Sequence, residues 1–290
     1  MKTRVFGAVV VLVVLITNAT AYRASAQQDT IRGWKAGGNF GINVTNIGLS
    51  NWLGGGQNTL AIAGLFTAFA HFRSEDSTLR WENALEFGYG QAQVGDVEFR
   101  KSDDRIIFTS KLAKRFDFTA PISASVLLDF RTQFDEGRDF AKQNSPLISR
   151  FFAPAFLVIA TGFSYKFEES LSLFLSPVGG RGVFVSDPQL SAEGAFGVDK
   201  GTTSRLDLGA SLNLLYKITP FENVNFQTRL NVFSPYRAFG AVAITWETLT
   251  IFKVNKFLNV SFDTQLLYEE KISRTRQLKT ALAVGFVLPF

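Results

Sequence analysis

The end of the chain, Leu278 to Phe290, constrains the fold more than any other stretch. Apolar side chains fill one face at every second position, with Thr280 as the only polar exception: Leu278, Leu282, Val284, Phe286, Leu288 and Phe290. A period of two over this length indicates a β-strand whose two faces meet different environments. A last strand of this kind has an open edge. In lipid, only closure onto the first strand of the same chain satisfies its backbone groups.

The chain stops on an aromatic residue, and another aromatic residue stands four positions earlier. This ending resembles the C-terminal signal by which bacterial outer-membrane proteins are handed to their insertion machinery. We therefore expect Phe286 and Phe290 to form an assembly signal. The expected partners are the barrel insertion machinery and the lipid of the outer membrane.

The N-terminus favours the same compartment. Lys2 and Arg4 precede an apolar run from Val5 to Ile16, and residues 24–26 (ASA) fit a signal-peptidase site. The run is shorter than the roughly 20 residues of a membrane-spanning helix. We predict a cleaved signal peptide over residues 1–26 and a single outer-membrane β-barrel domain over residues 27–290.

Composition excludes several classes of function. Loss of residues 1–26 removes Lys2, Arg4 and Arg23 and lowers the formal net charge from +5 to +2, so no basic block supports nucleic-acid binding. The chain has no cysteine, which excludes disulfides, lipoprotein anchoring and thiol catalysis. With one histidine, a histidine metal cluster is also excluded, and we expect no cofactor.

Short segments of alternating apolar residues repeat along the whole mature chain. We predict twelve strands, at residues 34–43, 59–73, 79–91, 104–116, 122–134, 155–167, 171–185, 203–217, 223–233, 241–252, 257–268 and 278–290. Strands of about 11 residues, tilted by about 45°, reach roughly 26 Å, close to the apolar band of about 25 Å in such barrels. The connections are predicted to alternate between long and short. The predicted fold is all-β, a transmembrane antiparallel up-and-down β-barrel of about twelve strands, with both termini in the periplasm.

Several segments also carry a family resemblance. They are LSNWLGGGQNTL, WENALEFGYG, FRKSDDRI, LDFRTQF, APAFL, LSLFLSPVGGRG and FKVNKFLNVSFDTQLLYEE. In this order, over roughly residues 34–272, the chain resembles the domain of unknown function 3078, a family found among outer-membrane proteins of the Bacteroidetes. The resemblance implies an outer-membrane barrel. It brings no activity, cofactor or catalytic residue.

Candidate catalytic and ligand-binding residues are few. His71 lies on the predicted inner face near the periplasmic end, away from the outer half where a hydrolase would need it, and we interpret it as structural. Asp103 and Asp104 are interpreted as a solvated loop end, with cation binding as the alternative. The loop that follows Trp52 is glycine-rich but is no phosphate loop, because no Gly-Lys-Ser/Thr follows. We therefore do not expect an enzyme.

Charged residues on the predicted inner face are the main candidates for function. The predicted lumen-lining charges are Arg80, Glu82, Glu86, Arg105, Lys111, Asp129, Arg131, Arg205, Asp207 and Arg229. Charged side chains inside a protein are tolerated only when they are paired with an opposite charge or remain hydrated. The lumen is therefore either aqueous or filled with ion pairs. A barrel of twelve strands lies between barrels of about 8 strands, which side chains fill, and barrels of about 16 strands, which leave an aqueous channel.

Two functions remain open on this basis. One is a narrow channel or transporter for small polar solutes. The other is a closed barrel that acts as a structural or interaction partner in an outer-membrane complex, with an unknown protein partner. An outer-membrane hydrolase is the weakest alternative, since no nucleophile and base pair is evident.

Overall fold

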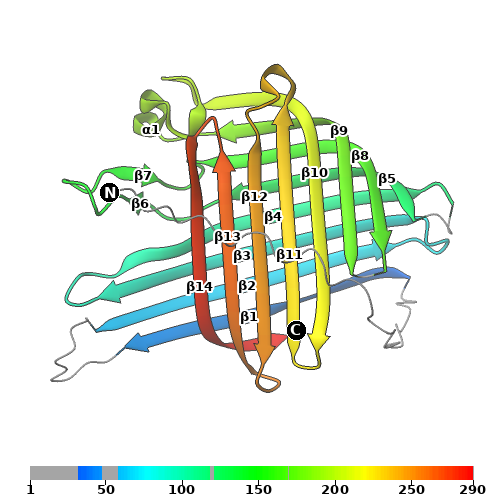
Figure 1. Cartoon of the computed structure of the whole chain (residues 1–290), viewed down its shortest axis with the longest axis horizontal. Helices are drawn as coiled ribbons and strands as arrows, with labels where there is room; N and C mark the ends of the chain where they lie inside the picture. Colours follow the sequence, from blue (N-terminus) through cyan, green and yellow to red (C-terminus); the bar gives the residue numbers. More distant parts are fainter. Residues whose placement is uncertain (1–31, 48–57, 118–120, 169, 290) are drawn as a thin grey trace, which may run out of the picture. The chain divides into compact units, whose positions relative to one another are not determined.

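The computed structural model describes residues 32–47, 58–117, 121–168 and 170–289. Twelve antiparallel strands close into one barrel, in the order β1-β14-β13-β12-β11-β10-β9-β8-β5-β4-β3-β2 (Figure 1). Each strand pairs with its neighbours along the chain, and β14 closes the circle against β1. The predicted all-β barrel of twelve strands is confirmed. The predicted signal peptide lies outside the described residues, and the periplasmic location of the termini stays a prediction.

The barrel strands agree closely with the periodicity of the sequence. Their bounds are β1 Gly33–Ile47, β2 Thr59–Arg73, β3 Leu79–Val94, β4 Arg100–Arg115, β5 Ile122–Thr132, β8 Ala155–Phe167, β9 Leu171–Phe184, β10 Ser204–Phe221, β11 Val224–Pro235, β12 Ala243–Lys253, β13 Leu258–Glu269 and β14 Ser273–Pro289. Strand β9 is continuous although Pro177 and Gly179 interrupt its pattern. A register shift in its pairing with β8 accommodates them.

The predicted alternation of long and short connections is wrong at two places. Strand β4 already begins at Arg100 and β14 at Ser273, so their connections shrink to residues 95–99 and 270–272. At the start of β4 the charged residues expected in a loop continue the ladder, and Asp103 there contacts Arg105. The longer connections, residues 133–154 and 185–203, lie at the same end as these two, which we call the long-loop end.

The longer connections contain structure that the sequence pattern did not indicate. Residues 133–154 hold a small two-stranded sheet, β6 Gly137–Arg138 and β7 Leu147–Ser149. Residues 185–203 hold α1 Pro188–Glu193 and the short 3₁₀ turn η1 Ala195–Gly197, and η2 Tyr236–Ala238 follows β11. Among the described residues, no helix has the length and apolar character needed to cross a membrane.

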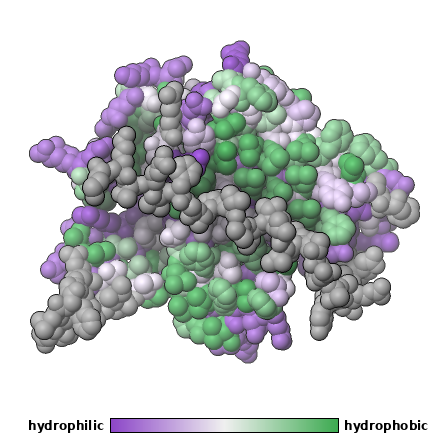
Figure 2. Space-filling view, viewed as in Figure 1, coloured by the Kyte–Doolittle hydropathy of each residue, from purple (hydrophilic) through white to green (hydrophobic). Residues whose placement is uncertain are grey.

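The outer surface of the wall is apolar and exposed. On β14 the outward positions Leu278, Leu282 and Phe286 are 67%, 68% and 64% exposed, as the sequence pattern predicts. Figure 2 shows hydrophobic side chains gathered over the barrel wall, with hydrophilic ones towards its ends. Near the short-turn end, the ring centroid of Trp34 lies 5.5 Å from that of Trp81. Aromatic side chains at this height are typical of the girdle that meets a membrane interface.

Candidate functional site

Charged side chains on three strands, β3, β4 and β14, meet in the middle of the lumen. Arg105 on β4 donates from Nε to Glu86 on β3 at 2.6 Å and contacts Asp103 at 3.0 Å. Lys279 on β14 donates from Nζ to the same Asp103 at 2.8 Å. Three strands, β3, β2 and β1, separate β4 from β14 along the wall. The contact between Lys279 and Asp103 therefore passes through the lumen.

A second group crosses the lumen nearby. Arg131 on β5 contacts Asp129 at 2.7 Å and reaches Glu247 on β12 at 3.6 Å. Glu247 also lies 3.5 Å from Arg229 on β11 and accepts a hydrogen bond from Gln265 at 3.0 Å. Four strands separate β5 from β12 along the shorter arc. We call the two groups together the middle network, comprising Glu86, Asp103, Arg105, Asp129, Arg131, Arg229, Glu247 and Lys279.

Charged side chains also meet across the lumen towards the short-turn end. Lys166 on β8 lies 3.4 Å from Glu82 on β3. Lys111 on β4 donates to Ser172 Oγ on β9 at 3.3 Å. His71 is paired in register with Glu82, and its ring centroid lies 5.0 Å from that of Phe69. Within the described part of the chain, no group of histidine, aspartate and glutamate side chains is arranged to hold a metal ion.

The long-loop end holds a third charged group, which we call the mouth network, comprising Arg181, Arg205, Asp207, Glu269 and Lys271. Arg181 on β9 makes two hydrogen bonds of 2.7 Å to Glu269 on β13. Arg205 on β10 contacts both Glu269 and Asp207 at 2.9 Å. Lys271 completes the group with a 2.6 Å contact to Asp207. A guanidinium held by both oxygens of one carboxylate is a strong, orientation-specific pair.

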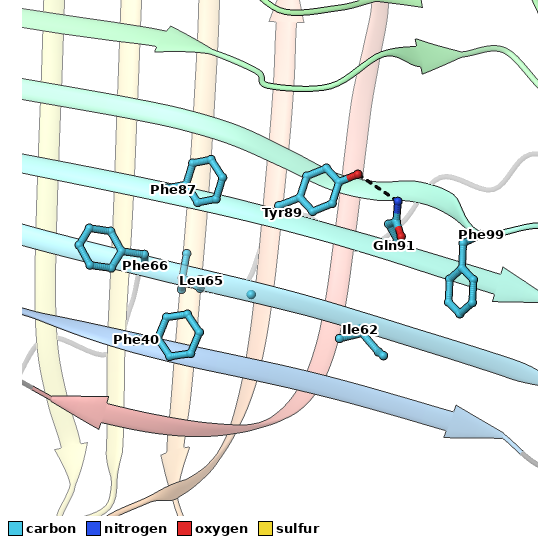
Figure 3. Close-up of a pocket in the computed structure, with 9 residues that line it drawn as sticks. Phe40, Ile62, Leu65, Phe66, Phe87, Tyr89, Gln91 and Phe99 are labelled. Atoms are coloured by element: carbon cyan, nitrogen blue, oxygen red, sulfur yellow. Dashed lines mark hydrogen bonds between the residues drawn. The ribbon is translucent and has the colours of Figure 1, made fainter.

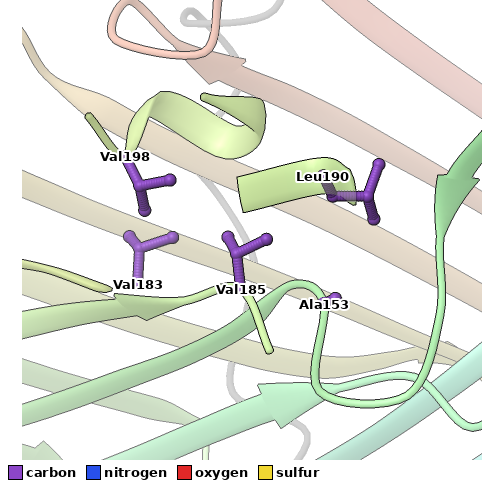
Figure 4. Close-up of a cluster of buried hydrophobic side chains, with 5 residues drawn as sticks. All are labelled: Ala153, Val183, Val185, Leu190 and Val198. Atoms are coloured by element: carbon purple, nitrogen blue, oxygen red, sulfur yellow. The ribbon is translucent and has the colours of Figure 1, made fainter. Parts of the chain in front are cut away.

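The same network fixes a loop across the mouth. Arg205 Nη1 donates to the carbonyl of Gly197 at 2.5 Å, which attaches η1 to the wall. Val183 and Val185 at the end of β9 pack with Leu190 of α1, and Ala153 and Val198 complete the buried cluster (Figure 4). Val183 follows Arg181 by two residues and so faces the lumen as Arg181 does. Residues 185–203 are thus packed over the inner side of the wall.

Asp187 caps the helix in this loop. Its carboxylate accepts a hydrogen bond from the backbone N–H of Leu190 at 3.0 Å and contacts Arg150 at 2.9 Å. The Leu190 hydrogen bond, assisted by Arg150, holds the pKa of Asp187 below its ordinary value. Arg150 also reaches Glu136 within its own connection at 2.6 Å, and its contact with Asp187 joins the two longest connections.

The structure brings most of the predicted lumen charges into contact with one another or with a nearby partner. Glu86 meets Arg105, Asp129 meets Arg131, and Arg205 meets Asp207. Glu82, Lys111 and Arg229 have the partners described above, and Arg80 lies on the same face of β3 as Glu82 and Glu86. That these residues carry a function stays a prediction.

Sequence reasoning missed several members of the networks. Asp103 and Glu269 were assigned to loops, and Arg181 falls in the interrupted segment of β9. A signal was present for two of them. Asp103 continues the alternation from Arg105, and Glu269 continues it from Asp263 and Gln265.

An apolar groove lies on the lipid-facing side of β1, β2 and β3. It has a volume of about 420 Å³ and is lined by Phe40, Ile62, Gly64, Leu65, Phe66, Phe87, Tyr89, Gln91 and Phe99 (Figure 3). Gly64 opens it, because a Cβ at this position would have no neighbour within 4 Å. In the lining, the side-chain amide of Gln91 donates to Tyr89 Oη, and the Tyr89 hydroxyl donates to Asp135.

Comparison with known families supports the resemblance noted in the sequence. Residues 44–137 match the family described as "Protein of unknown function (DUF3078)". The chain resembles this family. The matched segment runs from the end of β1 to the start of β6 and carries Arg80, Glu82, Glu86, Arg105, Lys111, Asp129 and Arg131. No curated protein sequence matches the chain.

Several solved barrels are similar in outline. An outer membrane channel from Pseudomonas putida F1 matches with a TM-score of 0.43 at 12% identity, over 90% of this chain and 96% of that one. The translocator domain of the autotransporter NalP from Neisseria meningitidis gives 0.38 at 9%, over 88% of each chain. The NanC porin gives 0.39 at 7%, over 87% of this chain and 98% of that one. At this level the likeness says nothing about activity.

The architecture itself decides the class of the protein. An antiparallel barrel whose last strand closes onto the first, with an apolar exterior around a charged interior, suits a membrane. The chain is an outer-membrane β-barrel protein.

Proposed function

We propose that this protein is a closed outer-membrane barrel that acts as an interaction partner in a membrane complex. The observation that carries the proposal is the set of ion pairs that cross the lumen, above all Arg131 with Glu247 and Lys279 with Asp103. A ring of uncompensated charge is one way in which a selective pore concentrates its ion. Here basic and acidic groups compensate one another at short distance.

The mouth supports the same proposal. Arg181 and Glu269 join β9 to β13 across the opening, and their side chains are only 10% and 14% exposed. The packed cluster of α1 and β9 lies beside them. A solute that passed this level would have to break several charge-assisted hydrogen bonds, which are about twice as strong as neutral ones.

The long-loop end also presents a surface for a partner. The arm formed by β6 and β7 carries exposed apolar side chains at Phe140, Ile148 and Phe151. It is held in place by Asp104, whose carboxylate accepts the N–H groups of Phe134 and Asp135 at 2.7 and 2.8 Å. Clustered exposed apolar residues on an ordered element are typical of an interaction site.

One observation favours the second candidate, a narrow channel for small polar solutes. Lys279 and Arg105 in the middle network remain 43% and 35% exposed, so water reaches them. A wet lumen below the mouth could pass small ions if the loop over the mouth moved aside.

Conductance of the purified protein in a planar bilayer tests the proposal. We expect a silent wild type, and a protein partner at a fixed ratio after gentle solubilisation of the outer membrane. Phe140→Ser with Phe151→Ser serves as the arm variant, and Lys142→Ser on the same arm is its control. Steady conductance, with a selectivity that Arg131→Glu reverses, would support the channel and contradict the closed barrel.

A further inference from the structure

The seam that closes the barrel is much shorter than the other contacts between strands. Strand β14 pairs with β13 from Ser273 to Phe286, but it pairs with β1 only from Gly285 to Pro289. This makes five register pairs, Asn39↔Pro289, Phe40↔Leu288, Gly41↔Val287, Ile42↔Phe286 and Asn43↔Gly285. Every other neighbouring pair of strands in the wall has at least ten.

A bend in β14 separates its two partners. The upper part of the strand runs beside β13, and its end turns to run beside β1 (Figure 1). Gly285 lies at the last pair of the seam, and the side-chain oxygen of Asn43 occupies the place where a Cβ would stand. A glycine inside a strand often marks such a corner or close approach. Above the corner, among the described residues, no strand pairs with the β1-facing edge of β14.

The direction of the free backbone groups follows from one hydrogen bond. The N–H of Val287 donates to the carbonyl of Phe257, so odd-numbered residues of β14 direct their N–H and C=O groups towards β13. Even-numbered residues direct theirs the opposite way. Leu278, Thr280, Leu282 and Val284 therefore present N–H and C=O groups along the edge that faces away from β13.

Side-chain exposure agrees with an open edge. Every residue from Thr275 to Thr280 is exposed, on both faces of the strand. Strand β2, which is paired on both sides, is only partly exposed along nearly its whole length. Leu278 and Leu282, on the lipid side of this edge, are more than two-thirds exposed.

Wherever such an edge lies in lipid it needs a hydrogen-bonding partner, because lipid cannot satisfy backbone groups. An acyl chain offers no donor or acceptor, whereas an extended polypeptide offers both at the spacing of the ladder. We propose that the edge of β14 from Ser273 to Val284 binds an extended strand of another protein by β-augmentation. The inference rests on the proposed role as an interaction partner and names the site of that interaction.

The edge also defines the chemistry of the incoming strand. Apolar side chains of that strand would lie beside Leu278 and Leu282 on the lipid face, and polar ones beside Lys279 on the lumen face. A carboxylate near Arg276, which is exposed close to the long-loop end, would complete the match. A second copy of the chain in the same membrane orientation presents this edge in the same strand direction. Two such edges cannot form an antiparallel ladder with each other.

Hydrogen exchange of single amides tests the edge itself. The probe is D₂O on the purified full mature chain in lipid nanodiscs, read by NMR. We expect fast exchange at Leu278, Thr280 and Leu282, and at least 100-fold slower exchange at Lys279 and Ala281, which face β13, and at Phe286 and Leu288 in the seam. Uniform protection of all these amides would overturn the inference.

Photo-crosslinking in intact cells tests the occupant. A benzophenone side chain at Leu282 should link to one other protein, at residues of that protein that alternate between apolar and polar. Thr280→Pro removes the edge-facing N–H and leaves the ladder with β13, so it should reduce the adduct at least tenfold. Thr280→Ala, which keeps the backbone donor, should leave the adduct unchanged.

Adducts only with lipid, or with a second copy of this chain, would overturn the inference, and so would equal yields from the two variants. A partner that is lost with the arm variant and indifferent to Thr280→Pro would refute the edge site and leave the proposed function standing. If no partner is found by either route, both proposals fail.

Discussion

The guanidinium of Arg131 on β5 lies 3.6 Å from the carboxylate of Glu247 on β12, with four strands between them along the wall. Both side chains also hold a nearer partner, Asp129 for Arg131 and Gln265 for Glu247. The barrel thus has contacts through its interior as well as around its wall. Such contacts stabilise a fold only when every charge keeps a partner, since an unpaired charge in a poorly solvated interior is costly.

Replacing Arg131 with Met should lower the free energy of unfolding by about 2–4 kcal/mol, because Asp129 and Glu247 would lose their common cation. The two side chains of the Arg131–Glu247 pair keep 19% and 22% exposure, so the loss should stay below that of a fully buried pair. Urea unfolding in detergent micelles, followed by tryptophan fluorescence, measures it.

A surface pair provides the matched control. Lys114 and Asp76 lie 3.9 Å apart with side chains 60% and 62% exposed, so Lys114→Met should leave the free energy of unfolding nearly unchanged. Equal losses for Arg131→Met and Lys114→Met would contradict a structural role for the middle network.

The fold could be predicted from the sequence because a strand in a membrane barrel shows its two environments at every second residue. The outward positions of β14, for example, are apolar without interruption apart from Thr280. The same alternation predicts Glu86, Arg105 and Arg131 on one face, and in the structure Arg105 contacts Glu86 while Arg131 contacts Asp129.

The contacts across the lumen could not be predicted in this way. Periodicity predicts which face of a strand a side chain occupies. It does not predict which residues of two strands distant in the chain lie opposite each other across the lumen. Arg181 and Glu269 are 88 residues apart and meet only because the barrel closes. Asp103 was assigned to a loop for another reason. A run of charged residues at a strand end has the same composition as a loop.

Changing Phe286 to Asp should prevent normal assembly. Phe286 is 64% exposed on the lipid face, and a carboxylate there costs up to about 2 kcal/mol in addition to the loss of the expected assembly signal. Surface level and heat-modifiable migration on gels report the outcome. Ala281→Asp, on the opposite face of the same strand, should assemble; Phe286→Asp reaching wild-type surface levels would contradict the lipid-facing assignment.

The orientation of the barrel can be tested with single cysteines, since the native chain has none. Cysteines at Gln143 and Glu193, in the long connections, should react with an impermeant maleimide on intact cells. Cysteines at Asp76 and Asn255, in the short turns, should react only after the outer membrane is breached. The opposite pattern would place the termini outside.

Acid should loosen the loop over the mouth. The pKa of Asp187 is lowered in the fold, so its ionised carboxylate stabilises the α1 cap above the unfolded pKa of about 3.9. That stabilisation is lost as the pH falls through the folded value. Amide exchange at Leu190, relative to exchange in β9, should therefore rise below about pH 4.

Two variants separate the charge of Asp187 from its role as a cap. Asp187→Asn keeps an acceptor for the N–H of Leu190, so it should lose most of the pH dependence while the loop stays in place. Asp187→Ala should cost about 1 kcal/mol of local stability at neutral pH. An unchanged acid response in Asp187→Asn would assign the effect to another carboxylate.

The length of the closing seam can be tested by disulfide formation in the membrane. Phe40 and Leu288 are register partners in the seam, so Phe40→Cys with Leu288→Cys should cross-link readily under mild oxidation. Extending the same register would pair Val44 with Val284, which are 48% and 50% exposed on the same face. Because β14 leaves β1 at Gly285, Val44→Cys with Val284→Cys should remain largely reduced. If both pairs oxidise equally fast, the strands meet above the corner as well, and the open edge does not exist in the membrane.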